Sequence, residues 1–116
     1  AGTLSAVDSE CDATDPVRVL HMHGTDDTTI GYSTTGGHRG ALDSVAYWAD
    51  LAGCSGPVND GTRDHHENLT GDETTVQTWD CPTGDLELWT AEGGDHIYLF
   101  NNSAYKDDLA DWLIAP

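Results

Sequence analysis

The chain has 116 residues, enough for one domain, and a domain of this length buries about two-thirds of the surface that its unfolded form exposes. Its 21 acidic and 4 basic residues give a formal net charge of -17, and Lys106 is the only lysine. Such a surface repels phosphates and so argues against nucleic-acid binding, and no run of about 18 apolar residues is present to span a membrane.

The first predicted element is a strand over residues 17–22. It follows Asp15-Pro16, where the proline disfavours a helical conformation for the residue before it. The residues are mainly β-branched or aliphatic and end abruptly at His23-Gly24, which is typical of a buried strand that opens into a loop. The loop runs to about residue 40, and long loops in small domains are usually functional.

Three further elements and a hairpin connection follow. Apolar residues at helical spacing predict a helix over 41–52, with Gly53 at the position of a left-handed cap. Residues 53–72 show little periodicity and are predicted to be loop. Strands over 74–80 and 85–91 are joined across residues 81–84, which indicates an antiparallel hairpin.

A last helix is predicted after the loop at Gly93-Gly94. Ser103 is a candidate for its N-terminal cap. One face of this helix would carry Tyr105, Leu109, Trp112 and Leu113.

The three cysteines are too few and too widely spaced for a zinc site of the CxxC kind. One disulfide and one leftover thiol are the simplest account of Cys11, Cys54 and Cys81. The segment Asp64-His65-His66-Glu67 contains possible metal ligands, but neighbouring histidines on an extended loop usually point apart. A solvated loop is the favoured interpretation, and we expect no metal site.

The order of motifs is the most informative feature. A strand, His-Gly-Thr-x-Asp, a helix, two strands, Gly-Gly-x-His and a final helix resemble the second half of the α/β-hydrolase fold. The segments PVRVLHMHGTDDTTIGY, VAYWADLAGCSG and AEGGDHIY resemble the polyhydroxybutyrate-depolymerase and feruloyl-esterase family, across residues 16–98. The resemblance implies a single domain over residues 1–116, a truncated three-layer α/β/α half-domain with a few-stranded sheet and two or more helices.

The resemblance implies a catalytic acid at Asp27 and a catalytic histidine at His96. The residue types fit this chemistry, because a serine nucleophile needs an imidazole base and that imidazole needs a carboxylate to orient it. Asp26 is adjacent and could exchange roles with Asp27. Tyr32 and Tyr98 are the candidate substrate-binding residues.

The serine nucleophile is missing. The strained turn that presents it requires Gly-x-Ser-x-Gly, and no such pentapeptide is present. The nearest match, residues 31–35 around Ser33, lacks the last glycine and follows no strand, so Ser33 is not expected to be the nucleophile. We therefore expect a carboxylic-ester-hydrolase domain that is inactive alone, needs no cofactor, and acts on an ester only if a second half completes it.

The resemblance has two further consequences. Asp95 precedes His96 where the family usually has glycine, and an inward-pointing carboxylate there would favour the imidazolium and weaken a general base. The family also tends to bridge the positions of Cys54 and Cys81, so a disulfide is expected between them. Such a bond suits a secreted, extracellular protein whose signal peptide has been removed or lies upstream.

Two non-catalytic alternatives stay open. The strand over 17–22 would lose its family neighbour, and its unpaired edge favours a homodimer. The loop over 23–40 could instead form a ligand-binding module with the aromatic residues Tyr32, Trp48 and Tyr98.

The charge predicts that salt stabilises the fold, as in a salt-adapted protein. Carboxylates that repel one another at low ionic strength are screened within about 3 Å in molar salt. We expect the urea midpoint of unfolding to rise strongly between about 0.05 M and about 1 M KCl. A chloride salt is used because sulfate also strengthens apolar burial. Equal midpoints at the two concentrations would contradict salt adaptation.

Overall fold

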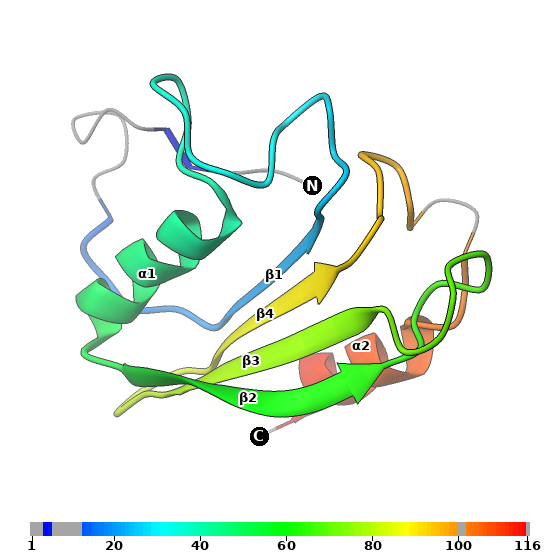
Figure 1. The fold of residues 1–116 in the computed structure, drawn as a ribbon. Helices are drawn as coiled ribbons and strands as arrows, with labels where there is room; N and C mark the ends of the chain where they lie inside the picture. Colours follow the sequence, from blue (N-terminus) through cyan, green and yellow to red (C-terminus); the bar gives the residue numbers. More distant parts are fainter. Residues whose placement is uncertain (1–3, 6–12, 100–101, 116) are drawn as a thin grey trace.

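The computed structural model describes residues 4–5, 13–99 and 102–115. In these residues a four-stranded mixed sheet has one helix on each face (Figure 1). The elements in chain order are β1 (Val19–Gly24), α1 (Ala41–Ala52), β2 (Ser55–Arg63), β3 (Thr74–Asp80), β4 (Leu86–Ala91) and α2 (Lys106–Ile114). The predicted α/β class is therefore confirmed.

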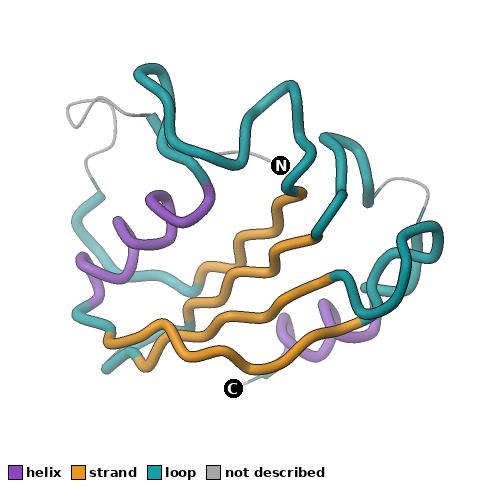
Figure 2. The backbone as a smooth tube through the Cα atoms, in the orientation of Figure 1, coloured by secondary structure: helices purple, strands orange, loops and turns teal. Residues whose placement is uncertain are grey.

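The strand order is β1-β4-β3-β2 (Figure 2). β3 and β4 form the predicted antiparallel hairpin, with Thr74 opposite Ala91 and Trp79 opposite Leu86. β1 runs parallel to β4, so these two strands end at the same edge of the sheet. Within the described residues β1 has a neighbour on one side only.

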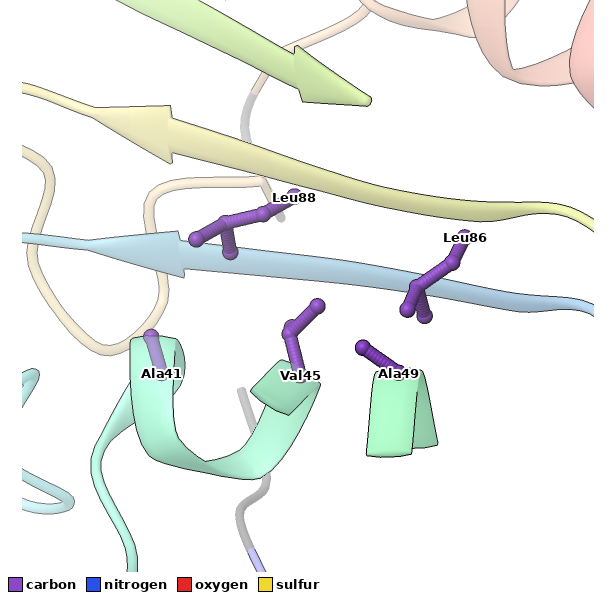
Figure 3. Packing of buried hydrophobic residues seen from close by; sticks show 5 residues of the cluster. All are labelled: Ala41, Val45, Ala49, Leu86 and Leu88. Carbon is purple, nitrogen blue, oxygen red and sulfur yellow. The ribbon is translucent and has the colours of Figure 1, made fainter. Parts of the chain in front are cut away.

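The core lies between α1 and the face of the sheet that α1 covers. Ala41, Val45 and Ala49 recur every four residues, which places them on one side of the helix, and all three are buried. They pack against Leu86 and Leu88 of β4 (Figure 3). Full burial of one leucine contributes about 1.5–3 kcal/mol to the stability of a fold. The two buried leucines therefore make this cluster an important apolar support of the sheet.

A disulfide joins the end of α1 to the end of β3. Gly53 closes the helix in the left-handed conformation, as predicted, with φ of 68°. Cys54 follows at once and is bonded to Cys81, 27 residues later in the chain. The expected disulfide is thus present, while Cys11 lies outside the described residues.

The prediction of a loop over residues 53–72 is wrong for its first half. Residues 55–63 form β2, an edge strand paired antiparallel with β3. Nearly all of its side chains are exposed, so no alternation of apolar residues marks it in the sequence. The pairing register shifts at two places in β2, in the segments 55–58 and 59–62, which contain Pro57 and Gly61. Edge strands tolerate proline and glycine at such irregularities.

The prediction of a cap at Ser103 is also wrong. α2 begins at Lys106, and the residue before it makes no side-chain capping bond. The Ser103 hydroxyl instead donates to the Glu67 carboxylate at 2.8 Å. The predicted apolar face holds only in part, because Leu113 is 60% exposed.

Polar contacts, rather than apolar burial, hold α2 on the second face of the sheet. The Arg18 guanidinium pairs with Asp85 at 2.9 Å and donates to the backbone carbonyls of Trp112 and Leu113. It also stacks over the Trp112 ring, 4.4 Å from its centre. These contacts occupy the carbonyl groups that a helix leaves unpaired at its C-terminus.

The segment 64–67 forms a second attachment of α2. His65 is 3% exposed, which corrects the interpretation of this segment as a solvated loop. Its Nε2 lies 2.6 Å from the Asp108 carboxylate on α2, and its ring packs on Trp89. Among the described residues no three His, Cys, Asp or Glu side chains are grouped to hold a metal ion, and no helix there is long and apolar enough to cross a membrane.

The Arg18 contacts predict that lysine cannot replace this arginine. Lys carries the same charge, but it has no planar fork with which to reach Asp85 and two carbonyls while stacking on Trp112. We expect Arg18→Lys to lower the free energy of unfolding by about 1–2 kcal/mol, measured by urea denaturation in molar KCl. The control is Arg63→Lys, at a half-buried arginine whose contacts, with Asp60 and with the carbonyls of Asp60 and Thr62, all stay within β2. Equal losses in the two variants would contradict the role of Arg18.

Candidate active site

The candidate site lies where two neighbouring parallel strands end. Gly24, the last residue of β1, is paired with Ala91, the last residue of β4. The loops that leave these strands stay joined, because Asp26 N–H donates to the Gly94 carbonyl at 2.9 Å. Gly24 permits this approach, since a Cβ there would lie 2.1 Å from the Gly94 oxygen. The loops carrying Asp27 and His96 are therefore held side by side.

Asp27 and His96 meet at this point. The Nδ1 atom of His96 lies 2.9 Å from Oδ2 of Asp27, although the residues are 69 positions apart. The Asp27 side chain is fully enclosed, whereas the His96 side chain is 32% exposed. Asp26 is exposed, so the structure places Asp27, and not its neighbour, beside the imidazole.

The Asp27 carboxylate is fixed by its own loop. Its Oδ1 atom accepts hydrogen bonds from the backbone N–H groups of Thr29 and Ile30, at 2.9 and 2.8 Å. Burial alone would raise the pKa of Asp27, but the hydrogen bonds from His96, Ile30 and Thr29 outweigh it and lower the pKa below its ordinary value. The carboxylate is thus ionised at neutral pH and accepts a hydrogen bond from the Nδ1–H group of His96.

This pairing leaves the other ring nitrogen of His96 available. With Nδ1 donating to Asp27, the lone pair of a neutral imidazole is on Nε2. None of the described residues makes a hydrogen bond to this Nε2. An oriented, partly exposed imidazole backed by a carboxylate can take a proton from a hydroxyl, which is the task of a general base.

Asp95 does not turn toward the imidazole it precedes. Its side chain is exposed, and its Oδ1 accepts a hydrogen bond from Ile97 N–H at 3.0 Å. The condition under which Asp95 would weaken His96 as a base is therefore not met.

The two tyrosines predicted to bind substrate are packed into the protein. The Tyr32 hydroxyl hydrogen-bonds to Thr90 at 2.8 Å, and its ring packs nearly perpendicular to the ring of His23. Tyr98 is 7% exposed and stacks on His66, and burial raises its pKa. Substrate contact by Tyr32 and Tyr98 stays a prediction.

No nucleophile accompanies the pair within the part of the chain that the structure describes. Among the described residues no serine hydroxyl bonds to His96. Ser33 lines a hollow with Tyr32 and Leu42 beside the start of α1. Ser44 donates to a backbone carbonyl, and Ser103 donates to Glu67.

His23 is the residue that sequence reasoning missed. It follows the predicted strand and opens the His-Gly-Thr-x-Asp motif, but it has no predicted role of its own. In the structure it is completely buried, and its Nε2 lies 3.3 Å from Oδ2 of Asp27. The alternation His21-x-His23 was the available signal, because it places both imidazoles on one face of β1.

Comparisons of the chain with models of known protein families, with curated proteins and with solved structures found no match. Membership of a hydrolase family therefore stays a prediction, and the function has to be inferred from the geometry of the site.

The lowered pKa of Asp27 predicts a pH-dependent contribution to stability. The ionised carboxylate stabilises the fold at pH values above its unfolded pKa of about 3.9, and this stability is lost as the pH falls through the lower folded pKa. We expect Asp27→Asn to have a lower free energy of unfolding than wild type at about pH 6. This difference in free energy should become smaller below about pH 4. Urea unfolding across this range, in molar KCl, measures the difference.

Asp26→Asn is the matched control, because Asp26 is the exposed neighbour. Its difference from wild type should stay small and vary little with pH. A constant difference for Asp27→Asn would show that the carboxylate charge is not what stabilises the loop.

Proposed function

We propose that this chain supplies the acid and the histidine of a Ser-Asp-His triad in a carboxylic ester hydrolase. The substrate class is a polyester or a feruloyl ester, and the serine comes from a segment outside these 116 residues. The hydrogen-bonded Asp27–His96 pair, with the Nε2 of His96 open, is the observation that carries the proposal.

The chemistry is acyl transfer. The serine oxygen attacks the ester carbonyl while its proton passes to Nε2 of His96, and ionised Asp27 stabilises the imidazolium. The carbonyl π electrons move to the oxygen, and when they return, the bond to the alcohol breaks and His96 gives its proton to that alcohol. Water then releases the acyl group by the same steps. No metal ion or organic cofactor is required.

The same chemistry makes the chain inactive alone. Among residues 4–5, 13–99 and 102–115 His96 has no hydroxyl to activate, and in α/β-hydrolases the donors of the oxyanion hole include one beside the nucleophile itself. A base without a nucleophile and without an oxyanion hole does not hydrolyse esters at an enzymatic rate. The disulfide supports an oxidising, extracellular location for the complete enzyme.

A second function is favoured by the outer edge of β1, which has no strand neighbour among the described residues. The N–H groups of Val19 and Thr25 donate to carbonyls in and beside β4, so the odd-numbered residues of β1 face β4. The backbone groups of Leu20 and Met22 then face outward, since strand residues alternate in direction. Such an edge pairs readily with a second copy, giving a non-catalytic homodimer.

The test begins with the coding sequence that precedes residue 1. A continuous frame encoding Gly-x-Ser-x-Gly defines the longer protein, which is assayed on p-nitrophenyl butyrate in molar KCl. We expect hydrolysis, with kcat lowered by about 10³–10⁴-fold in His96→Ala and in Asp27→Asn. Asp26→Asn is the control and should retain wild-type kcat. The 116-residue chain alone should be no faster than its His96→Ala variant.

Three results would overturn the proposal. Activity of the long protein that survives His96→Ala would remove His96 from the mechanism. Activity of the short chain above that of its His96→Ala variant would mean that the nucleophile lies within the 116 residues. A dimer of the short chain at high salt, with no upstream serine motif, would favour the homodimer.

A further inference from the structure

A second imidazole contacts the carboxylate of Asp27. The ring of His23 is completely buried. Its Nε2 lies 2.8 Å from the Ile30 carbonyl oxygen and 3.3 Å from Oδ2 of Asp27, the same oxygen that faces His96. Both neighbours of this nitrogen are hydrogen-bond acceptors, so Nε2 of His23 must carry a proton.

The other nitrogen of His23 faces a third histidine. Nε2 of His21 lies 3.2 Å from Nδ1 of His23, and the two rings are nearly parallel, at 10°. Burial, together with the neighbouring His23, lowers the pKa of His21 to about 4, so His21 is neutral at pH 7. A neutral His21 with its proton on Nε2 donates to Nδ1 of His23 and leaves no buried nitrogen of His23 unpaired.

We propose that His23 is a positioning residue for Asp27, and that His21 holds His23 in the tautomer whose Nε2–H donates to the Ile30 carbonyl and lies beside the carboxylate. This inference rests on the proposed function, since positioning matters for catalysis only if Asp27 orients a catalytic histidine. The three imidazoles and the carboxylate then form one chain of contacts, from His21 on β1 to the exposed edge of His96.

The geometry explains why the contact from His23 matters. Two backbone N–H groups hold Oδ1 of Asp27, but a carboxylate held at one oxygen can still turn about that contact. His23 contacts the second oxygen and restricts this rotation. The ring of His23 packs in turn against the ring of Tyr32, with ring centres 5.6 Å apart and an angle of 87° between the planes. The Tyr32 hydroxyl is hydrogen-bonded to Thr90 of β4. Oδ2 is thus kept aimed at Nδ1 of His96 before any substrate arrives.

The test observes the imidazole nitrogens of the ¹⁵N-labelled chain by nuclear magnetic resonance at pH 7 in molar KCl. In the wild type we expect His21 and His23 as Nε2–H tautomers and His96 as the Nδ1–H tautomer. His23→Leu should lose the protected Nδ1–H resonance of His96 while the backbone amide spectrum stays folded. His23→Gln, whose amide N–H can reach the position of Nε2, should retain it.

Two further variants keep the test decisive if His23→Leu does not fold. His21→Phe keeps a ring at position 21 but removes the donor, and should shift His23 away from a single Nε2–H tautomer. His66→Leu removes an imidazole that stacks on Tyr98 and should leave the His96 resonance unchanged. The proposal is overturned if wild-type His23 carries its proton on Nδ1, or if a folded His23→Leu protein keeps the His96 resonance.

These outcomes are independent of esterase activity. A long protein without hydrolysis would refute the proposed function and leave the tautomers as they are. An active long protein in which His23→Leu changes neither the His96 resonance nor kcat, while His96→Ala abolishes hydrolysis, would refute the role of His23 alone.

Discussion

The parallel pairing of β1 with β4 is the constraint on which the site depends. Two loops that follow the ends of neighbouring parallel strands can share hydrogen bonds. Here Asp26 N–H donates to the Gly94 carbonyl, and Thr25 N–H donates to the Ala91 carbonyl. The contact is so close that only glycine fits at position 24. Asp27 and His96 therefore meet because backbone groups are paired, before either side chain contributes.

The rest of the fold supports the β1–β4 pairing with few buried apolar side chains. One small cluster under α1 supports β4, and the disulfide ties the helix end to β3. On the other face, α2 has no buried residue and is held by Arg18 and by the pair of His65 with Asp108. Each of the three arginines of this acidic chain makes a contact through its guanidinium group. Arg18 stacks on Trp112 of α2, Arg39 stacks on Tyr47, and Arg63 pairs with Asp60.

The candidate site combines an imidazole oriented by a buried carboxylate with no serine hydroxyl bonded to that imidazole among the described residues. One oxygen of Asp27 accepts hydrogen bonds from backbone N–H groups, and the other lies beside the imidazoles of His96 and His23. The carboxylate charge is therefore fixed next to Nδ1 of His96. Preorganisation of this kind is useful only if charge develops at His96 during a reaction. We favour a partner segment that carries a serine for two further reasons. In the described part of the chain, Nε2 of His96 has no hydrogen-bond partner and β1 has no strand on its outer side.

The sequence by itself determined those elements whose signal is local. The helix over 41–52, the β3–β4 hairpin and the left-handed Gly53 follow from apolar spacing and turn chemistry within a few residues. β2 was missed because an exposed edge strand needs only backbone pairing with β3, and Ser103 was misread because Glu67 reaches it from 36 residues away. Only the tertiary structure decided the burial of His65, the choice of Asp27 over Asp26, and the contact of His23 with the carboxylate. These depend on distances between segments far apart in the chain, which no local pattern encodes.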